Sequence, residues 1–447
     1  MNILSKIYFF SPFLIQKILL NVKAHYIKSF RYGKDFHSYL KKFNNSKANE
    51  IDVAQFRKFL VSANATSFWK EKFKEYNIDI ESQDIINEIQ KLPILSKNEV
   101  KNNIKQIKNE DLDEKITQIN TSGTTGSGLN FIQTISMEQK QWAIWWRYRN
   151  LHKISINTWM GWFGGKTIMS INKKTKPFWV TNYPMKQIMF SNYHLNEKSI
   201  QSYVKKINDS KLEWLHGYPS QINNLANLIY SNCSKEDVPK IKYITVGGEN
   251  LLHAQKKNIE DIFKTKVIQH YGLAEGVSNI SQDLNGNFVP DQDFSFTEFI
   301  PLNQEEPSIC KVIGTNYSNE AFPLIRYDTG DIAEVEWKNG KVIRIISIDG
   351  RKEDYVTLPN GVKLGRLDHI FKDINNVDEA QIYQPNINNL MVRIVKGKNY
   401  TKKDENKILI NIKHKIGKNS LNVKFKYLNY IPKTKSGKLR FVISEID

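Results

Sequence analysis

The chain carries, after a strand-like segment at residues 116–121, the run Thr121-Ser122-Gly123-Thr124-Thr125-Gly126-Ser127-Gly128. Glycines let backbone N–H groups curl around an anion, and the hydroxyl side chains add donors without bulk. A helical pattern follows over residues 137–151, so a loop between a strand and a helix is predicted here, and it is suited to a polyphosphate. The run lacks the Gly-Lys-Ser/Thr ending of the common P-loop and its lysine. A flexible polar loop is the alternative interpretation.

Beyond this loop, residues 212–322 alternate short apolar runs with helical patterns. The run 243–246 is typical of a buried strand, and helical spacing covers residues 221–230 and 251–263. This alternation predicts β-α units with a parallel sheet. From residue 332 onward the pattern changes to hairpins, with an Asn-Gly turn at residues 339–340.

A chain of 447 residues is long enough for a large and a small domain. We predict an α/β protein whose large N-terminal domain, residues 1–350, contains mixed and parallel sheets, helices and a helical N-terminal region. A hinge at about residues 351–354 would lead to a small α+β C-terminal domain, residues 355–447. Strand-like runs at 381–383 and 391–395 and a helical pattern at 403–416 indicate the α+β character of this part.

The balance of charges is strongly basic: 65 Lys and Arg against 46 Asp and Glu give a formal charge of +19. Such a charge attracts phosphates, nucleic acid or anionic lipids. Because the lysines are spread along the whole chain, a general compositional bias explains them, and we do not expect nucleic-acid binding. The two cysteines, Cys233 and Cys310, form no Cys-x-x-Cys pair, which argues against a disulfide framework or a zinc site and favours a cytoplasmic location.

The N-terminal segment combines apolar residues with Lys17, Lys23, Lys28 and Arg31. It is too short and too polar to span a bilayer, and no small-residue cleavage site follows it. An amphipathic helix remains, which either packs on the body of the protein or lies on the inner face of a membrane. Packing is favoured, because surface helices of globular proteins commonly carry such an apolar stripe.

Four further segments follow the hydroxyl-rich loop: Tyr271-Gly272-Leu273-Ala274-Glu275, Arg326-Tyr327-Asp328-Thr329-Gly330-Asp331, Gly350-Arg351 and Pro432-Lys433-Thr434-Lys435-Ser436-Gly437-Lys438. In order and spacing these segments resemble the signature motifs of adenylate-forming enzymes. The resemblance is closest to the phenylacetate-CoA ligase group and its CapK-like relatives, which are associated with capsular polysaccharide. It spans residues 90–440, including segments at 92–97 and 216–220.

The resemblance implies ATP and Mg²⁺ as cofactors and a role for each motif. The residues that would contact ATP are Thr121, Ser122, Gly123, Thr124, Thr125 and Gly126 at the phosphates, Gly247, Gly248, Glu249, Tyr271 and Gly272 around adenine, and Asp331 and Arg351 at the ribose. Glu275 would be catalytic by holding Mg²⁺, which neutralises the triphosphate. An ordinary surface glutamate is the alternative for Glu275, and a plain turn for residues 328–331.

Lys438 would be the second catalytic residue, because it would neutralise charge on the α-phosphate and the carboxylate as they join. A solvated lysine in a basic tail is the alternative. In such enzymes the small domain is mobile and rotates between the two half-reactions, with the pivot expected at residues 352–354. Two positions depart from the family, Ala274 in place of Thr or Ser and Gly128 in place of Pro. One lost hydrogen bond costs only about 0.5–1.5 kcal/mol.

Candidate substrate contacts are Trp142, His216 and Tyr218. Trp142 shares a helical face with Trp145, Trp146 and Arg149, a pattern that core packing also explains. A satisfied, buried histidine is the commoner case for His216.

We therefore predict that the chain activates a carboxylic acid as an acyl-adenylate, releases pyrophosphate and transfers the acyl group. The CapK-like resemblance favours a sugar amine or hydroxyl of a surface polysaccharide or its precursor as the acceptor. CoA is the alternative acceptor, and the basic surface would attract its phosphates. A catalytically silent, basic protein that docks on membranes or nucleic acid is a third hypothesis.

Overall fold

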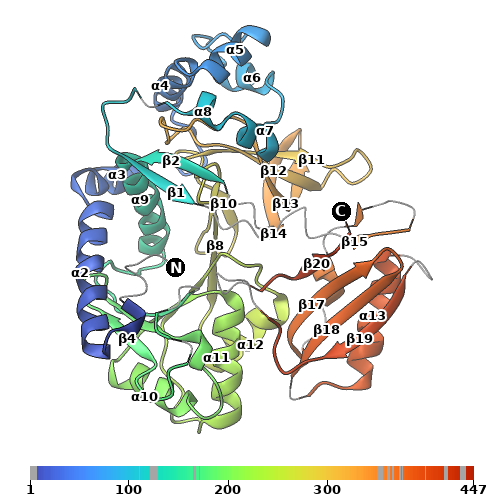
Figure 1. Cartoon of the computed structure of the whole chain (residues 1–447). Coiled ribbons are helices and arrows are strands. Elements are labelled where there is room, and N and C mark those ends of the chain that lie inside the picture. Colours follow the sequence, from blue (N-terminus) through green and yellow to red (C-terminus); the bar gives the residue numbers. More distant parts are fainter. Residues whose placement is uncertain are drawn as a thin grey trace. The chain divides into compact units, whose positions relative to one another are not determined.

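The computed structural model of the chain describes residues 8–109, 111–120, 129–164, 168–170, 172–349, 356–359, 363–364, 367–371, 374, 376–397, 399–416, 421–432 and 439–446. The chain forms two compact units (Figure 1). Unit 1 comprises residues 1–24, 157–269 and 352–447, and unit 2 comprises residues 25–156 and 270–351. The predicted hinge at 351–354 lies outside the described residues, so the division there stays a prediction.

The first sheet of unit 1 confirms the predicted β-α alternation. Its strands lie in the order β8 (Val267–Gly272), β7 (Tyr243–Val246), β6 (Trp214–Gly217), β3 (Met160–Phe163), β5 (Gln187–Phe190) and β4 (Trp179–Asn182). All neighbours pair in parallel except β4, which is antiparallel to β5. The accompanying helices are α10 (Ile200–Asp209), α11 (Pro219–Asn232) and α12 (His253–Phe263).

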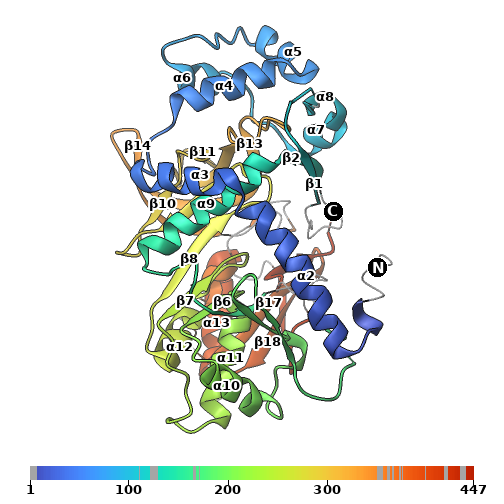
Figure 2. The same cartoon turned by 90° about the vertical axis from the view of Figure 1, so that its left-hand side faces the viewer.

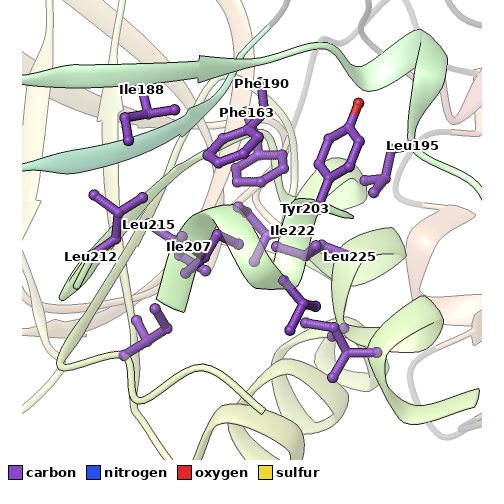
Figure 3. Packing of buried hydrophobic residues seen from close by; sticks show 14 of the residues in the cluster. Phe163, Ile188, Phe190, Leu195, Tyr203, Ile207, Leu212, Leu215, Ile222 and Leu225 are labelled. Atoms are coloured by element: carbon purple, nitrogen blue, oxygen red, sulfur yellow. The ribbon is translucent and has the colours of Figure 1, made fainter. Parts of the chain in front are cut away.

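Aromatic side chains form the centre of the core between this sheet and its helices (Figure 3). Phe163 of β3 stacks on Phe190 of β5 with ring centroids 4.8 Å apart. Tyr203 of α10 is also fully buried, and its hydroxyl donates to the Ser191 carbonyl oxygen at 2.7 Å. Burial of a side chain of this size contributes roughly 1.5–3 kcal/mol each, so these contacts fix the helices on the sheet.

The C-terminal part of unit 1 has the α+β character that the sequence predicts. Its sheet has the order β19 (Asn422–Tyr427), β18 (Asn389–Lys396), β17 (Val377–Asn386) and β20 (Val442–Ser444). Two short strands, β15 (Val356–Thr357) and β16 (Lys363–Leu364), and the 3-10 helix η2 (Leu367–Phe371) precede it. Helix α13 (Lys402–Ile416) contributes Ile408 and Ile412 to a core shared with Ile382 and Val392.

Unit 2 is built on antiparallel strands. They lie in the order β11 (Phe296–Pro301), β12 (Ile309–Thr315), β13 (Tyr327–Lys338), β14 (Lys341–Asp349), β10 (Phe288–Pro290), β9 (Asn279–Gln282) and the end of β8. Asn339 and Gly340 both have positive φ, 52° and 72°, as a type I′ turn requires. The predicted hairpin at this position is confirmed.

Helices and a separate hairpin complete unit 2. The helices are α3 (Lys34–Asn45), α4 (Val53–Asn64), α5 (Ser67–Glu75), α6 (Ile85–Gln90), α7 (Lys97–Asn102), α8 (Ile104–Ile107) and α9 (Ile135–Leu151), and β1 (Ile116–Asn120) pairs with β2 (Asn130–Thr134). Ser96 caps α7 by accepting a hydrogen bond from the Glu99 backbone N–H at 3.1 Å. The strand and the helix predicted around residues 116–151 are therefore present, but strand β2, which the sequence analysis did not predict, lies between them, and residues 121–128 lie outside the described residues.

The N-terminal helix α2 (Phe13–Arg31), blue in Figures 1 and 2, corrects one prediction. Packing was the favoured interpretation for its apolar residues, and it holds for Phe13 and Leu20, which contact the core of unit 1. Large apolar side chains on another face of α2 are exposed instead: Leu14, Ile18 and Val22. Phe10, which precedes α2, is exposed as well. Among the helices within the described ranges, none has the length and apolar character needed to cross a membrane.

Candidate active site

Two of the predicted motifs meet in unit 2. Tyr271, near the C-terminal end of strand β8, donates a hydrogen bond from its hydroxyl to Asp331 Oδ2 at 2.6 Å. Asp331 belongs to β13, 60 residues further along the chain. The side chains of Asp331 and Glu275 are both buried, with 7% and 8% of the residue exposed. Tyr271, Glu275 and Asp331 therefore lie in one unit, whereas Gly247, Gly248 and Glu249, which are also predicted to contact adenine, belong to unit 1.

The pKa of Tyr271 also reflects the proximity of Asp331 and Glu275. Burial raises the pKa of Tyr271 well above its ordinary value, the charge of Asp331 and the hydrogen bond to it raise this pKa further, and the carboxylate of Glu275 adds to the effect. Nearby negative charge disfavours the phenolate. Tyr271 consequently remains a protonated hydrogen-bond donor to Asp331 at physiological pH.

A tight turn at the start of β13 holds Asp331. Gly330 has φ +77°, a conformation that glycine adopts without strain, and its N–H donates to Asp328 Oδ1 at 2.9 Å. The Asp331 N–H donates to Thr329 Oγ1 at 3.0 Å, and the Thr329 hydroxyl donates to the Val312 carbonyl oxygen at 2.7 Å. The turn that served as the alternative interpretation thus exists, and it carries the buried Asp331.

Thr329 is a residue that the sequence analysis did not single out. It also hydrogen-bonds Tyr271, so it contacts both members of the Tyr271–Asp331 pair. A hydroxyl residue two positions before the aspartate is a signal for such a turn, but the same residue types occur in many solvent-exposed turns.

The backbone around Glu275 is held from two sides. Asn316 Nδ2 donates to the Glu275 carbonyl oxygen at 3.1 Å, and Gln141 Nε2 of α9 donates to the Leu273 carbonyl oxygen at 3.1 Å. Gly276 has φ +66°, and a Cβ there would collide with the Met137 side chain. Asn316 was another residue missed from sequence, since it acts on a backbone carbonyl and leaves no motif.

Glu275 is the one side chain predicted to bind a metal ion at this site. Across the part of the chain that the structure describes, no group of three or more His, Cys, Asp or Glu side chains is arranged to hold a metal. Mg²⁺ is commonly bound by one or two carboxylates together with phosphate oxygens and water. Glu275 therefore fits an ion that takes its remaining ligands from a bound polyphosphate.

In unit 1, Glu249 connects two segments of the resemblance. Gly248 before it has φ +76°. Glu249 Oε2 accepts a hydrogen bond from the Ser220 N–H at 3.3 Å, and Oε1 accepts one from the Leu439 N–H at 2.9 Å. Leu439, the first described residue after the C-terminal motif, therefore contacts the segment predicted to bind adenine.

Of the predicted substrate residues of unit 1, His216 belongs to β6 and Tyr218 follows this strand. His216 Nδ1 lies 2.8 Å from Thr245 Oγ1, and the indole of Trp214 donates to the same hydroxyl at 2.8 Å. Tyr218 is the residue that precedes α11. These contacts give His216 a structural partner, and substrate contact by His216 or Tyr218 stays a prediction.

The predicted aromatic stripe on α9 forms a cluster with His270 in unit 2. His270 stacks on Tyr148 with ring centroids 5.4 Å apart, and its pKa is lowered to about 3 by burial and by the charge of Arg149. Arg149 lies over Trp146, 4.9 Å from the ring centroid. Trp142 is half-buried, and Arg31 lies over it at 4.4 Å. The cluster is packed, as the core interpretation expects, but the two ring nitrogens of His270 and the Tyr148 hydroxyl are buried without a hydrogen-bond partner among the described residues. A substrate role for Trp142 stays a prediction.

Several predicted residues lie outside the described ranges. They are the loop residues Thr121, Ser122, Gly123, Thr124, Thr125 and Gly126, together with Arg351 and Lys438. Their assignments stay predictions.

Comparisons with known proteins agree with the motifs. A family model described as the CapK C-terminal domain matches residues 357–445. Protein CapK of Staphylococcus aureus is 27% identical over 466 aligned residues, which cover 99% of this chain and 100% of the relative. A phenylacetate-coenzyme A ligase of Thermus thermophilus is 26% identical over 168 residues, which cover 35% of this chain and 38% of the ligase.

Solved structures show the fold. The 2-hydroxyisobutyryl-CoA ligase in its postadenylation state, in complex with R3-HIB-AMP, superposes with a TM-score of 0.64 at 14% identity, covering 88% of each chain. A large α/β part with mixed and parallel strands and a smaller C-terminal α+β part is therefore the fold of this chain. The full-length similarity to Protein CapK, the match to the CapK C-terminal domain, the partial similarity to a phenylacetate-coenzyme A ligase and this fold confirm the predicted resemblance to the adenylate-forming enzymes of the phenylacetate-CoA ligase and CapK-like group.

Proposed function

We propose that this protein is a ligase that activates a carboxylic acid as an acyl-adenylate, using ATP and Mg²⁺ and releasing pyrophosphate. The observation that carries the proposal is the hydrogen bond between Tyr271 and the buried carboxylate of Asp331, with Glu275 close enough to raise the pKa of the same tyrosine. Further support comes from two relatives by name: a phenylacetate-coenzyme A ligase and a ligase structure holding an acyl-AMP.

In the proposed reaction an oxygen of the substrate carboxylate attacks the α-phosphorus of ATP, and the P–O bond to pyrophosphate breaks. Asp331 accepts hydrogen bonds from the ribose hydroxyls, and Tyr271 fixes that carboxylate while offering its ring face to adenine. Glu275 would hold Mg²⁺, and the ion would supply positive charge that neutralises the phosphates. Lys438 stabilises the charge that develops where carboxylate and α-phosphate join.

For the second half-reaction we propose transfer to an amine or hydroxyl of a sugar in a surface polysaccharide or its precursor. The full-length similarity to Protein CapK supports this choice, because the CapK-like group is the closer resemblance. CoA is the second candidate acceptor, and it is supported by the CoA ligases among the similar proteins.

The test is ATP–pyrophosphate exchange across a panel of carboxylic acids, followed by transfer to CoA or to amino sugars. Lys438→Ala should suppress pyrophosphate release and leave ATP binding nearly intact, whereas Lys435→Ala in the same tail should change neither. Equal pyrophosphate release by wild type and Lys438→Ala would defeat the assignment. Absence of exchange with every acid, together with tight binding to anionic vesicles or DNA, would favour the silent docking protein.

We also infer that α2 attaches the protein to the inner face of a membrane with anionic lipids. Leu14, Ile18 and Val22 recur every four residues, the spacing of one face of α2, and 61–71% of each residue is exposed. Phe10, which precedes the helix, is 85% exposed. No acidic residue precedes Asp35 in the sequence. An apolar stripe without acidic neighbours suits the headgroup region of an anionic bilayer.

Vesicle sedimentation tests this attachment. The full chain should bind phosphatidylcholine vesicles that contain phosphatidylglycerol and bind pure phosphatidylcholine less well. The double variant Leu14→Glu, Ile18→Glu should lose binding. Val61→Glu is the matched control, because Val61 of α4 is 54% exposed and lies outside the stripe. Equal binding by the double variant and the control would refute membrane attachment through α2.

A further inference from the structure

Unit 1 contains an open cleft of about 1060 Å³ between the segment 192–198, helix α11 and the C-terminal strands β17 and β18. Its lining is rich in carboxamides: Asn192, Asn223, Asn224, Asn227, Asn232 and Asn429. Each carboxamide both donates and accepts hydrogen bonds without carrying charge. A surface of this kind matches ligands with several hydroxyl groups.

Charge in the cleft runs opposite to that of the whole chain. The acidic and basic side chains among the described lining residues are Glu197, Asp378, Glu379 and Lys198. Acidic residues therefore outnumber basic ones here, although the whole chain has a formal net charge of +19. A ligand with several phosphates, such as the nucleotide part of CoA, would be repelled. A neutral ligand or one with an ammonium group is favoured.

The cleft contains hydrogen-bonding capacity that no described residue uses. Ser220 is 3% exposed, and neither its hydroxyl nor Asn192 Oδ1 has a hydrogen-bond partner among the described residues. Both residues line the cleft. Buried polar atoms are seldom left without a partner, but these two atoms are themselves covered, so a ligand in the cleft would reach them only after a change of side-chain rotamer.

A fixed network forms one wall of the cleft. The Asn258 amide donates to Asn223 Oδ1 at 2.8 Å and to Asn227 Oδ1 at 2.7 Å. Both acceptor oxygens are thereby occupied, and the NH₂ group of Asn227 is directed to the carboxylate of Asp378. Burial raises the pKa of Asp378 to about 6. Asp378 is therefore a preorganised acceptor for a ligand hydroxyl or ammonium.

Two tyrosines add flat apolar faces. Tyr193 and Tyr430 line the cleft and are 55% and 72% exposed. An aromatic ring presents an apolar face together with a polar tip. A sugar ring has the complementary surface, with C–H groups on its faces and hydroxyl groups around its edge.

The cleft adjoins the segment of Glu249, which also belongs to unit 1. Ser220, which lines the cleft, donates its backbone N–H to Glu249, and Glu249 also accepts from Leu439 next to Lys438. A ligand in the cleft would therefore have one end near the segment predicted to hold the adenylate.

We propose that this cleft binds the acyl acceptor as an amino sugar, with the carboxamides and Asp378 contacting its hydroxyl and ammonium groups and Tyr430 its ring face. This assignment rests on the proposed function. It names the substrate class of the second half-reaction and the residues that select it.

The experiment is titration calorimetry of the full chain with glucosamine, galactosamine, N-acetylglucosamine and CoA. Amino sugars should bind, Tyr430→Ala should weaken their binding about tenfold, and Asp378→Asn should remove the preference for amino over N-acetylated sugars. Tyr230→Ala is the control, since Tyr230 of α11 is 60% exposed and is not among the lining residues. Its sugar binding should equal that of wild type.

ATP–pyrophosphate exchange by the wild-type protein, measured without sugar, tests the adenylation hypothesis separately from the hypothesis that the cleft binds an amino sugar. Exchange without sugar binding would overturn the cleft assignment alone. Sugar binding without exchange would leave the cleft as a sugar site and overturn the adenylation that it is meant to serve. Binding of CoA that Tyr430→Ala weakens would also overturn the amino-sugar assignment, in favour of a thioester-forming ligase.

Discussion

Asp331 of unit 2 and Asp378 of unit 1 are both hydrogen-bonded acids, but their surroundings differ. Asp331 is 7% exposed and accepts a hydrogen bond from a buried tyrosine near a second carboxylate. Asp378 lines an open cleft among neutral carboxamides. The first arrangement concentrates negative charge away from water, where it suits a cation and a nucleotide. The second offers weak, exchangeable contacts that suit recognition of hydroxyl groups.

This difference sets the size of the effects expected from mutation. Hydrogen bonds to a charged group are worth about 1.5–3 kcal/mol, and neutral ones about 0.5–1.5 kcal/mol. Water competes in an open cleft and is excluded from a buried pair. Changes at Asp331 should therefore exceed changes in the cleft.

The largest effect is expected for Asp331→Asn. Loss of the charge weakens the bonds to the ribose hydroxyls and to Tyr271, so ATP–pyrophosphate exchange should fall roughly 10- to 150-fold. Asp328→Asn is the matched control on the same turn, because an amide oxygen can still accept from the Gly330 N–H. Similar losses in both variants would show that the turn, rather than the Asp331 carboxylate, is what the reaction needs.

Tyr271→Phe should have the next largest effect. The variant keeps the ring face and removes the hydroxyl that donates to Asp331 at 2.6 Å, which leaves a buried carboxylate with one donor fewer. We expect KM for ATP to rise roughly tenfold with a smaller change in kcat, because the carboxylate is less well positioned before chemistry begins. An unchanged KM for ATP would indicate that Thr329 alone holds Asp331.

The Tyr271–Asp331 side of this comparison could be predicted from the sequence, and for a physical reason. Tyr271 and Asp331 lie in motifs whose residue types the nucleotide chemistry restricts, and their hydrogen bond confirms that the two motifs meet. The helical pattern over residues 137–151 also predicted helix α9, and the short apolar run at 243–246 predicted strand β7, which is buried over three consecutive residues.

The cleft of unit 1 was not predicted. Its lining joins Asn192, Asn227, Asp378 and Tyr430, which are widely separated in sequence, and asparagines in an asparagine-rich chain carry no signal by themselves. Thr329 and Asn316 were missed for a related reason: they bind backbone groups, which every residue possesses. Contacts of this kind emerge only when the chain is folded.

The wall of the cleft provides a smaller effect. Asn258→Leu removes the amide that orients Asn223 and Asn227, so binding of glucosamine should weaken about two- to tenfold, the range of a neutral hydrogen bond. Asn258→Gln, which retains a donor, should recover part of the loss. Identical calorimetric affinities for all three proteins would exclude a positioning role for Asn258.

The smallest effect concerns how ionisation of Asp378 changes the stability of the folded protein. Burial raises its pKa from an ordinary value of 3.8 to about 6, so the folded protein binds this proton more tightly than the unfolded chain. The stabilising contribution of the proton is complete below about pH 4 and is lost as pH rises through 6. Asp378→Asn removes the ionisable group, and at pH 7.5 it should stabilise the protein by about 1 kcal/mol after allowance for solvent screening.

Thermal unfolding at pH 4 and pH 7.5 measures this difference: a gain in Tm confined to the higher pH is expected. A loss of Tm at pH 7.5 would mean that the Asp378 carboxylate is stabilised by its amide neighbours more than it is penalised by burial, and the contrast with Asp331 would then disappear.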